Sequence, residues 1–173
     1  MKKTATVYWL LPAKPERELF CNIIRILRKE FRAPNFEPHL TLFLNGKDTI
    51  SPRKVLRKIR LRPVRLRARG VSFSQKFTKT LFVRFNSGPA LRKLVTHVAR
   101  VAKSRAKAPK DPHVSLLYRK MSRAAKKEMA SVLQLPFRQV VFDTVVAVRL
   151  SLPVQTGTDV ERWKIVARKS LRR

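Results

Sequence analysis

The feature that most constrains the fold of this chain is a six-residue phrase that occurs twice. Residues 37–42 read Glu-Pro-His-Leu-Thr-Leu, and residues 111–116 read Asp-Pro-His-Val-Ser-Leu. We call these segments the first and the second motif. The 173-residue chain has three histidines, and two of them occupy the same position in the two motifs. The repeat predicts two similar halves, each of which contributes one imidazole and one hydroxyl to a shared site.

Each motif has the pattern of a β-strand with one polar and one apolar face. Side chains alternate between the two faces of a strand, so His39 and Thr41 share one face while their aliphatic neighbours share the other. His113 and Ser115 pair in the same way. The proline of each motif fits the first residue of a strand, where its missing N–H does least harm. We expect the aliphatic faces to pack on a core and the polar faces to line a cleft.

Two imidazoles in one cleft suit acid–base chemistry, because near neutral pH one can be neutral while the other is protonated. The neutral ring can accept a proton, and the cationic ring can give one to a leaving oxygen. The hydroxyls of Thr41 and Ser115 can donate hydrogen bonds to an oxyanion. A single His-x-Ser/Thr triplet is a weak signal, and a lone His on a strand is usually a packed core residue. The duplication favours a catalytic site for a phosphate ester.

With these residues in view, the sequence resembles the 2H phosphoesterase superfamily, which is named for two His-x-Ser/Thr motifs. The likeness is greatest to its cyclic phosphodiesterases, which open the cyclic phosphates of nucleosides and ADP-ribose. It runs nearly end to end and includes residues 7–12, 33–39, 113–118 and 161–163. It implies an α+β, bilobal fold with two antiparallel sheets and outer helices in a pseudo-two-fold arrangement around a central cleft. We expect residues 1–173 to form a single bilobal domain, with lobes centred on 39–42 and 113–116 and terminal strands that can cross between them.

The resemblance also implies a reaction, which is metal-independent hydrolysis of 2′,3′-cyclic phosphates on nucleotides or RNA 3′ ends without a cofactor. The catalytic residues that it implies are His39 and His113. The substrate-binding residues that it implies are Thr41, Ser115, Tyr118 and Trp9, the last as a wall on which a base could stack.

The alternation of side chains along a strand conflicts with the role implied for one of these residues. Tyr118 lies five positions after His113, so on a regular strand it faces away from the cleft. It reaches the site if the strand ends or bulges after Leu117, and otherwise it covers the core. Phe43 has the parity to share the cleft with the first His, although a Phe near a strand end is as often a packing residue.

The chain is strongly basic, with 41 Lys and Arg against 10 Asp and Glu and a formal net charge of +31. Such a charge favours a polyanionic partner, and RNA is the natural one. The cations are spread along the whole chain and mark no single face, so a basic composition without a specific partner is the alternative. We expect RNA contact through the basic surface. An alternative function is an RNA-binding protein that recognises terminal phosphates with little or no turnover.

Other classes of protein fit poorly. The sequence has no His-Glu-x-x-His and no cysteine cluster, which argues against a metal site. Its four glycines form no phosphate-binding loop, and no Gly-x-Ser-x-Gly elbow occurs. No apolar run approaches the ~18 residues of a membrane span. The N-terminus lacks a signal-peptide core, which predicts a cytoplasmic protein. We expect a monomer, and a structural role for the single Cys21.

Periodicity and turn signals predict the order of elements. Strands are expected over residues 4–11, 39–44, 64–73, 80–85, 113–118, 138–152 and 162–168. Helices are expected over residues 15–31, 52–59, 89–102 and 122–133, with a turn over 156–159. His97 falls on the third of these helices, outside either motif, and is assigned no chemistry.

Overall fold

Seven antiparallel strands form one sheet in the computed structural model, which describes residues 2–46 and 48–172. The strands are β1 (Lys3–Pro12), β2 (Leu40–Asn45), β3 (Val64–Phe73), β4 (Leu81–Phe85), β5 (His113–Leu117), β6 (Gln139–Leu152) and β7 (Lys164–Ser170). The helices are α1 (Glu16–Phe31), α2 (Pro52–Arg57), α3 (Pro89–Val101), α4 (Arg123–Val132) and α5 (Gly157–Glu161), with a 3-10 turn η1 (Phe77–Lys79).

The sheet joins the two halves of the molecule. Its order is β1-β2-β5-β4-β3-β6-β7, and β1 also pairs with β6. The long strand β6 pairs with β3 through its first residues and with β1 and β7 through the rest. Strands β2 and β5 meet in a single pair, Leu40 with Val114. The expected α+β bilobal fold is confirmed, and its two sheets are connected into one through β6 and through this pair.

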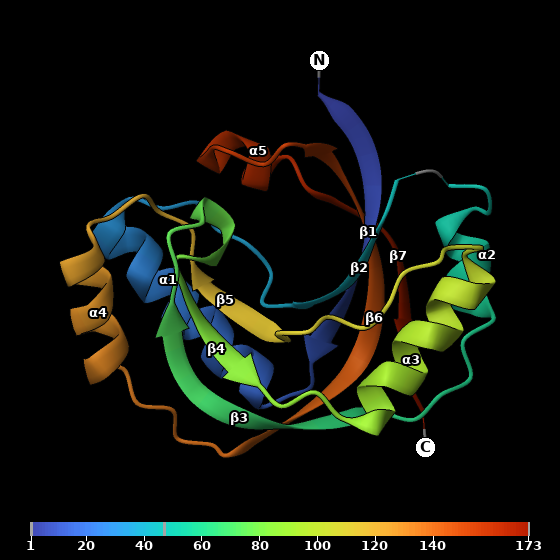
Figure 1. The fold of residues 1–173 in the computed structure, drawn as a ribbon, viewed down its shortest axis with the longest axis horizontal. Coiled ribbons are helices and arrows are strands. Elements are labelled where there is room, and N and C mark those ends of the chain that lie inside the picture. Colours follow the sequence, from blue (N-terminus) through green and yellow to red (C-terminus); the bar gives the residue numbers. More distant parts are fainter. Residues whose placement is uncertain (1, 47, 173) are drawn as a thin grey trace.

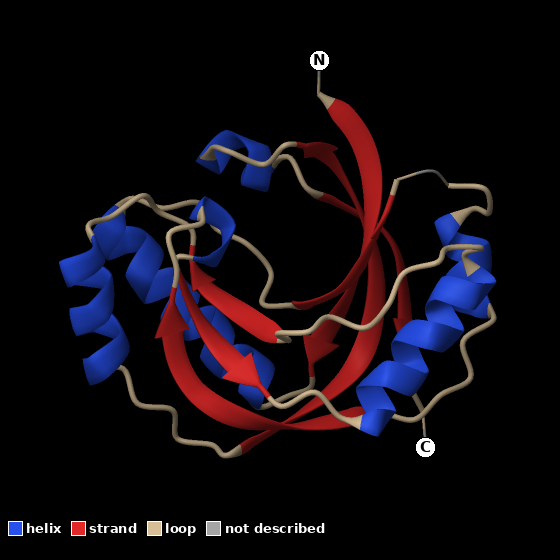
Figure 2. Cartoon of the chain, in the orientation of Figure 1, coloured by secondary structure: helices blue, strands red, loops and turns tan. Residues whose placement is uncertain are grey.

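Four of the five α-helices in the described residues lie outside the strands, two on each half. Figure 1 shows α1 and α4 on one side of the strands and α2 and α3 on the other. Figure 2 shows the same separation by secondary structure, with the strands between the two groups of helices. Helices α1 and α4 contact β5 and β3, whereas α2 contacts β6 and β7. Each group of helices thus covers one half of the sheet and leaves the space between the halves to the motif strands.

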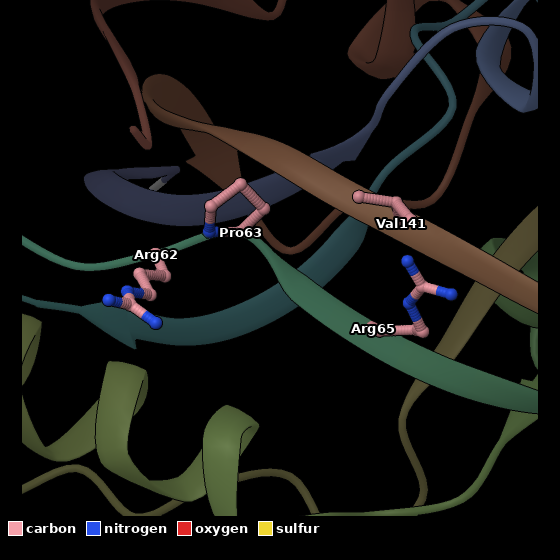
Figure 3. Close-up of a pocket in the computed structure, with 4 residues that line it drawn as sticks. All are labelled: Arg62, Pro63, Arg65 and Val141. Carbon is pink, nitrogen blue, oxygen red and sulfur yellow. The ribbon is translucent and has the colours of Figure 1, made fainter. Parts of the chain in front are cut away.

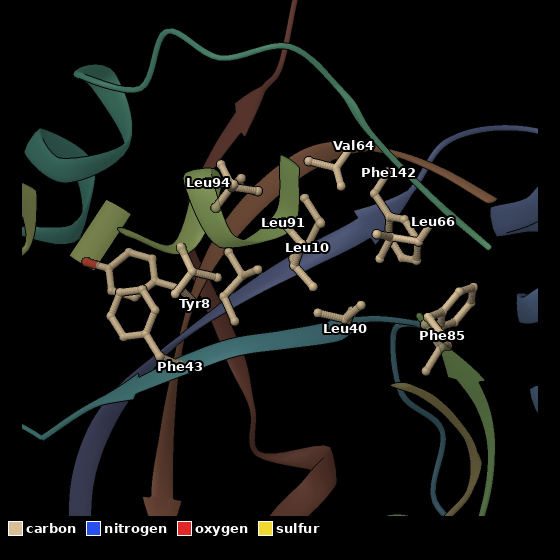
Figure 4. Packing of buried hydrophobic residues seen from close by; sticks show 14 of the residues in the cluster. Tyr8, Leu10, Leu40, Phe43, Val64, Leu66, Phe85, Leu91, Leu94 and Phe142 are labelled. Carbon is tan, nitrogen blue, oxygen red and sulfur yellow. The ribbon is translucent and has the colours of Figure 1, made fainter. Parts of the chain in front are cut away.

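Buried side chains from both halves meet in one main hydrophobic cluster, to which β1, β2, β3, β4, β6 and α3 contribute (Figure 4). The residues labelled there are Tyr8, Leu10, Leu40, Phe43, Val64, Leu66, Phe85, Leu91, Leu94 and Phe142. Burial of one Leu or Phe side chain contributes ~1.5–3 kcal/mol, so this cluster holds the halves together. A second cluster, which includes Val7, Trp9 and Leu150, lies on the opposite face of β1 and β6.

Two local expectations are wrong. Residues 156–159, expected as a turn, lead into helix α5, because the Thr156 and Asp159 side chains and backbones cap each other reciprocally. Cys21, expected to be structural, is exposed on α1, because the buried stripe of that helix consists of Phe20, Ile24 and Leu27. Among the described residues, no helix combines the length and the apolar character that a membrane crossing requires.

Candidate active site

A cleft with a volume of about 430 Å³ lies where the two motifs meet. All six residues that the sequence singled out line it: His39, His113, Thr41, Ser115, Tyr118 and Trp9. The remaining lining residues are Val7, Leu44, Lys76, Thr78, Lys79, Leu150, Leu152 and Trp163. The fold therefore gathers both motifs, which lie 74 positions apart in the chain, around one space.

The pair of Leu40 with Val114 explains how the motifs face each other. The two strands run antiparallel and are hydrogen-bonded neighbours at this pair, where opposed Cα atoms lie ~5 Å apart. Continuing the register by one residue sets Thr41 against His113 in one direction. In the other direction it sets the first imidazole against Ser115. The two motif strands therefore approach each other at this pair, and the polar side chains on either side of it line one cleft.

The second motif strand contains a β-bulge that decides on which face of the strand Tyr118 lies. Between Ser115 and Leu117 the register of β5 against β4 shifts, and Leu116 is the extra residue. A bulge reverses the alternation of faces beyond it. Leu116 and Leu117 therefore both join the core, and Tyr118 lines the cleft. The conflict with strand parity disappears because the strand bulges at Leu116 and ends at Leu117.

The first motif strand contains the same bulge at the same place. Leu42 is the extra residue of β2 in its register against β1. Phe43 therefore turns into the core, where its ring centroid lies 4.9 Å from that of Tyr8. The parity prediction that placed Phe43 in the cleft is wrong for this reason, and its alternative as a packing residue is correct. Leu44 takes the cleft position instead, and it is the counterpart of Tyr118 in the other half.

Backbone carbonyls orient both imidazoles. His39 Nδ1 lies 2.6 Å from the carbonyl oxygen of Glu37, and His113 Nδ1 lies 2.8 Å from that of Asp111. A carbonyl oxygen can only accept, so each ring donates through Nδ1–H. In the neutral ring, Nε2 is then the atom without a proton. Both imidazoles are thus held in the tautomer that keeps Nε2 free to exchange a proton with a ligand.

The acidic side chains of the motifs hold cations rather than the imidazoles. The Glu37 carboxylate pairs with Arg17 of α1 at 2.8 Å. The Asp111 carboxylate pairs with Lys79 and, at 3.0 Å, with Arg84. Burial alone would raise the pKa of Asp111, but Lys79 and Arg84 bring it below its usual range. Both carboxylates therefore anchor the start of a motif strand, and that of Asp111 remains ionised.

His39 lies in an apolar, aromatic environment. Its ring stacks on Trp9 with centroids 3.6 Å apart and planes 12° from parallel, and the edge of Trp163 lies 5.9 Å away. The residue is 7% exposed. Burial lowers the pKa of His39 from 6.5 to about 4, despite the favourable carbonyl of Glu37. Trp9 itself is 3% exposed, which favours a role in holding the imidazole plane; a base-stacking role for it stays a prediction.

His113 lies in a more open and more polar environment. Its ring meets the edge of Phe82 at 5.2 Å, and Lys79 stands over the same Phe82 ring at 4.3 Å. Burial lowers the pKa of His113, the carbonyl of Asp111 raises it, and the charge of Lys79 lowers it again. At neutral pH both imidazoles of the free protein are therefore mainly neutral.

The hydroxyl groups of the cleft differ in how firmly they are held. The Ser115 hydroxyl is buried and donates to the backbone oxygen of Thr78 at 3.1 Å, whereas Thr41 is exposed to the cleft. Tyr118 is buried against Phe36, with ring centroids 4.0 Å apart. Burial raises the pKa of Tyr118 far above its usual value, so the phenol stays protonated and can donate a hydrogen bond.

Sequence reasoning missed the segment between β3 and β4, which supplies Lys76, Thr78 and Lys79 to the cleft. Lys126 of α4, itself 3% exposed, holds this segment by donating to Ser74 O at 3.0 Å and to the Gln75 side chain. No motif marks the segment, and its position depends on packing against α4. Within residues 2–46 and 48–172, no three His, Cys, Asp or Glu residues cluster as metal ligands would.

The comparison with protein families is decisive for the class of this chain. Residues 4–171 match the family described as "Cyclic phosphodiesterase-like protein". The chain belongs to this family. Among curated proteins, the Cyclic phosphodiesterase of Arabidopsis thaliana is 25% identical over 130 residues, which cover 73% of this chain and 72% of that protein. The chain is therefore an enzyme of the 2H phosphoesterase superfamily.

Solved structures show that the fold of this cyclic phosphodiesterase-like protein is shared with bacterial proteins. LigT of E. coli complexed with 3′-AMP has a TM-score of 0.59 at 16% identity, and each chain is covered completely. The protein TT0787 of Thermus thermophilus also has a TM-score of 0.59, at 18% identity, over 97% of this chain and 98% of that one. At these identities the likeness is one of fold.

Proposed function

We propose that this protein hydrolyses 2′,3′-cyclic phosphates on nucleotides or RNA 3′ ends without a metal ion, using His39 and His113 as general acid and base. The observation that carries the proposal is that both imidazoles line one cleft with Nδ1 bound to a backbone carbonyl and Nε2 left to exchange protons. The family relationship, and the 3′-AMP and phosphate held by LigT, support a nucleotide phosphate as the substrate.

The reaction needs one neutral and one protonated imidazole. The neutral ring takes a proton from water as the water oxygen attacks phosphorus in line with the leaving ribose oxygen. The phosphorus–ribose bond breaks, and the protonated ring gives its proton to that oxygen, which leaves a phosphomonoester and a free hydroxyl. Since burial lowers the pKa of both rings, the bound phosphate anion supplies the charge that raises the pKa of the acid.

The other polar groups of the cleft stabilise the charge on the phosphoryl oxygens. The hydroxyl of Thr41 and the phenol of Tyr118 are donors on the walls of the same cleft, and the hydroxyl of Ser115 joins them when it turns from the backbone oxygen of Thr78 toward the ligand. Donors held in place before the reaction stabilise developing charge without reorganisation. Lys79 and Lys76 add positive charge to the same wall. The apolar wall around Trp9 excludes water from the first imidazole.

The proposal is tested by incubating the protein with nucleoside 2′,3′-cyclic monophosphates in EDTA and identifying the products by phosphorus NMR. We expect turnover by the native protein in EDTA and a loss of ~10²–10⁴-fold in the His39→Ala and His113→Ala variants. Identification of the phosphomonoester also reveals which ribose oxygen leaves. Full activity in either variant, or inhibition by EDTA that added metal reverses, would contradict the proposal.

The net charge of +31 favours a second candidate, an RNA-binding protein that recognises terminal phosphates with little or no turnover. Such a protein binds RNA with a steep dependence on salt, and its affinity depends on the phosphate at the RNA end. The same assay on an RNA with a 2′,3′-cyclic phosphate end distinguishes the two functions. Binding without product formation would favour the second. A monomeric, cytoplasmic protein stays a prediction from the sequence.

A further inference from the structure

A strongly basic groove lies on the molecule away from the catalytic cleft. A cavity of about 550 Å³ shares Arg62 with a cavity of about 470 Å³ and shares Arg60 and Lys169 with a cavity of about 590 Å³, so the three adjoin one another in sequence. The cationic residues that line them are Lys54, Arg57, Lys58, Arg60, Arg62, Arg65, Lys169 and Arg172. We call this surface the basic groove. No acidic residue lines it within the described part of the chain.

The charges of the basic groove are not compensated. Across residues 2–46 and 48–172, none of its eight cations takes part in an ion pair. In the cleft, by contrast, Lys79 is paired with Asp111. Like charges gathered on one surface repel each other and weaken the folded state unless an anion binds there. Most cations of the described residues also lack an ion pair, so the groove is distinguished by the gathering of eight cations along adjoining cavities that no acidic residue lines.

Two cations of the groove, Arg60 and Arg62, lie on the connection between α2 and β3. Residues 59–63 form neither helix nor strand and connect α2 to β3. Their apolar side chains are held by the protein, with Ile59 1% exposed, whereas Arg60 and Arg62 are exposed. Figure 3 shows Arg62, Pro63 and Arg65 at the entry to β3, with Val141 of β6 beside them.

One guanidinium of the groove is already held in place. Arg60 Nη1 donates to the backbone oxygen of Arg57 at 2.7 Å and to that of Ile59 at 3.2 Å. A side chain that is fixed before binding loses less conformational entropy when it meets a phosphate. Planar guanidinium groups also bind phosphate oxygens in pairs, which suits the five arginines of the groove.

The groove is separate from the cleft. Val141 lines the groove near the start of β6, and Leu150 lines the cleft near its end. These positions are ~30 Å apart along the strand at the usual rise per residue. A mononucleotide in the cleft therefore does not touch the groove, whereas a longer chain of nucleotides can contact both surfaces.

From these observations we infer that the basic groove is a binding site for the phosphate backbone of single-stranded RNA, distinct from the catalytic cleft. Eight cations spread along three adjoining cavities fit a linear polyanion better than they fit a small ligand. The groove holds the RNA without reading its sequence, because its contacts are to phosphates.

A matched pair of triple variants tests this site. The groove variant carries Lys58→Gln, Arg62→Gln and Arg65→Gln. The control variant carries Arg92→Gln, Lys93→Gln and Arg123→Gln, which remove the same charge from exposed positions of α3 and α4. The probe is a fluorescein-labelled single-stranded RNA with an ordinary 3′-hydroxyl end, titrated from 50 to 200 mM NaCl. Because this RNA is not a substrate, its binding reports on the groove whether or not the proposed reaction occurs.

Three lost phosphate contacts reduce the slope of log affinity against log salt by ~2 for a single strand. The affinity of the native protein should therefore fall ~20-fold more than that of the groove variant across this salt range. The control variant should keep the native slope, and both variants should keep the native turnover of cyclic mononucleotides. An equal reduction of the salt slope in the groove variant and the control variant would show that RNA responds to the total charge of the protein. That result would overturn the site. The groove variant could instead keep the native slope of log RNA affinity against log salt and lose binding to vesicles of anionic phospholipid. That result would overturn RNA as the ligand of the groove.

Discussion

The two motifs share a fold, a bulge and a carbonyl-bound imidazole, yet they place their histidines in different surroundings. In the first motif, His39 is stacked on Trp9 and almost fully desolvated. In the second, His113 meets only the edge of Phe82 and lies near the paired cation Lys79. The position five residues after each histidine is Leu44 in one half and Tyr118 in the other. A repeated strand therefore fixes geometry, and the neighbours that are not repeated set the chemistry of each imidazole.

The strongest test of this comparison asks whether the two histidines act as a unit. His39→Ala and His113→Ala should each lower turnover by ~10²–10⁴-fold, which is ~3–5 kcal/mol in the barrier. The turnover of the double variant should be only slightly lower than that of the less active single variant. Removal of either imidazole already disables proton transfer. Single-turnover rates on a cyclic mononucleotide measure the effect. Losses that multiply in the double variant would mean that the two imidazoles act independently.

The difference in burial predicts a difference in acid stability. The pKa of His39 is about 4 in the folded protein and 6.5 when unfolded, so below pH 6.5 the unfolded chain binds a proton that the folded chain does not. The free energy of unfolding should therefore fall as the pH drops from 6.5 to 4, by on the order of 3 kcal/mol from this residue.

Urea denaturation at pH 7, 5.5 and 4 measures this contribution. His39→Asn should remove most of the acid-dependent loss, because asparagine carries no titrating group. His113→Asn is the matched control and should remove less of it, because His113 is the less buried of the two. Equal pH dependence in the native protein and the His39→Asn variant would refute the desolvation of that imidazole.

The two motif hydroxyls should contribute differently. Thr41→Val keeps the shape of the side chain and removes a donor that is free in the cleft, so turnover should fall ~10²-fold. The turnover of the Ser115→Ala variant should fall as far. This substitution should also disturb the segment between β3 and β4, since Ser115 donates to the Thr78 carbonyl at 3.1 Å. Steady-state kinetics and thermal unfolding separate these effects. A Thr41→Val variant within two-fold of the native rate would exclude that hydroxyl from oxyanion stabilisation.

The smallest expected effect tests the pair of Leu44 and Tyr118. Tyr118→Phe removes one donor and keeps the ring against Phe36, so turnover should fall ~10-fold, in line with one hydrogen bond to a charged group. Leu44→Ala changes only the apolar wall and serves as the control, with an effect on KM rather than on kcat. A native kcat in Tyr118→Phe would leave that residue as a packing residue at the end of the strand.

Local patterns predicted most of the elements because they report which face of a segment is buried. The amphipathic stripe of α1, and the run of apolar residues in β1 that is buried on both faces of the strand, follow directly from where apolar residues recur. Helix α5 was missed because five residues carry too short a pattern, although the cap at Thr156 was visible as a turn signal. The exposure of Cys21 was missed because it lies at the border of the buried stripe.

The amino-acid sequence by itself determined the two motif strands, the pairing of each histidine with a hydroxyl and the excess of positive charge. It could not decide which way Phe43 and Tyr118 point, because each bulge is defined by the register against a neighbouring strand. Nor could it place Lys79 in the cleft or gather Arg62 and Lys169 in one groove. Those placements depend on contacts between segments far apart in the chain, and only the tertiary structure brings such segments together.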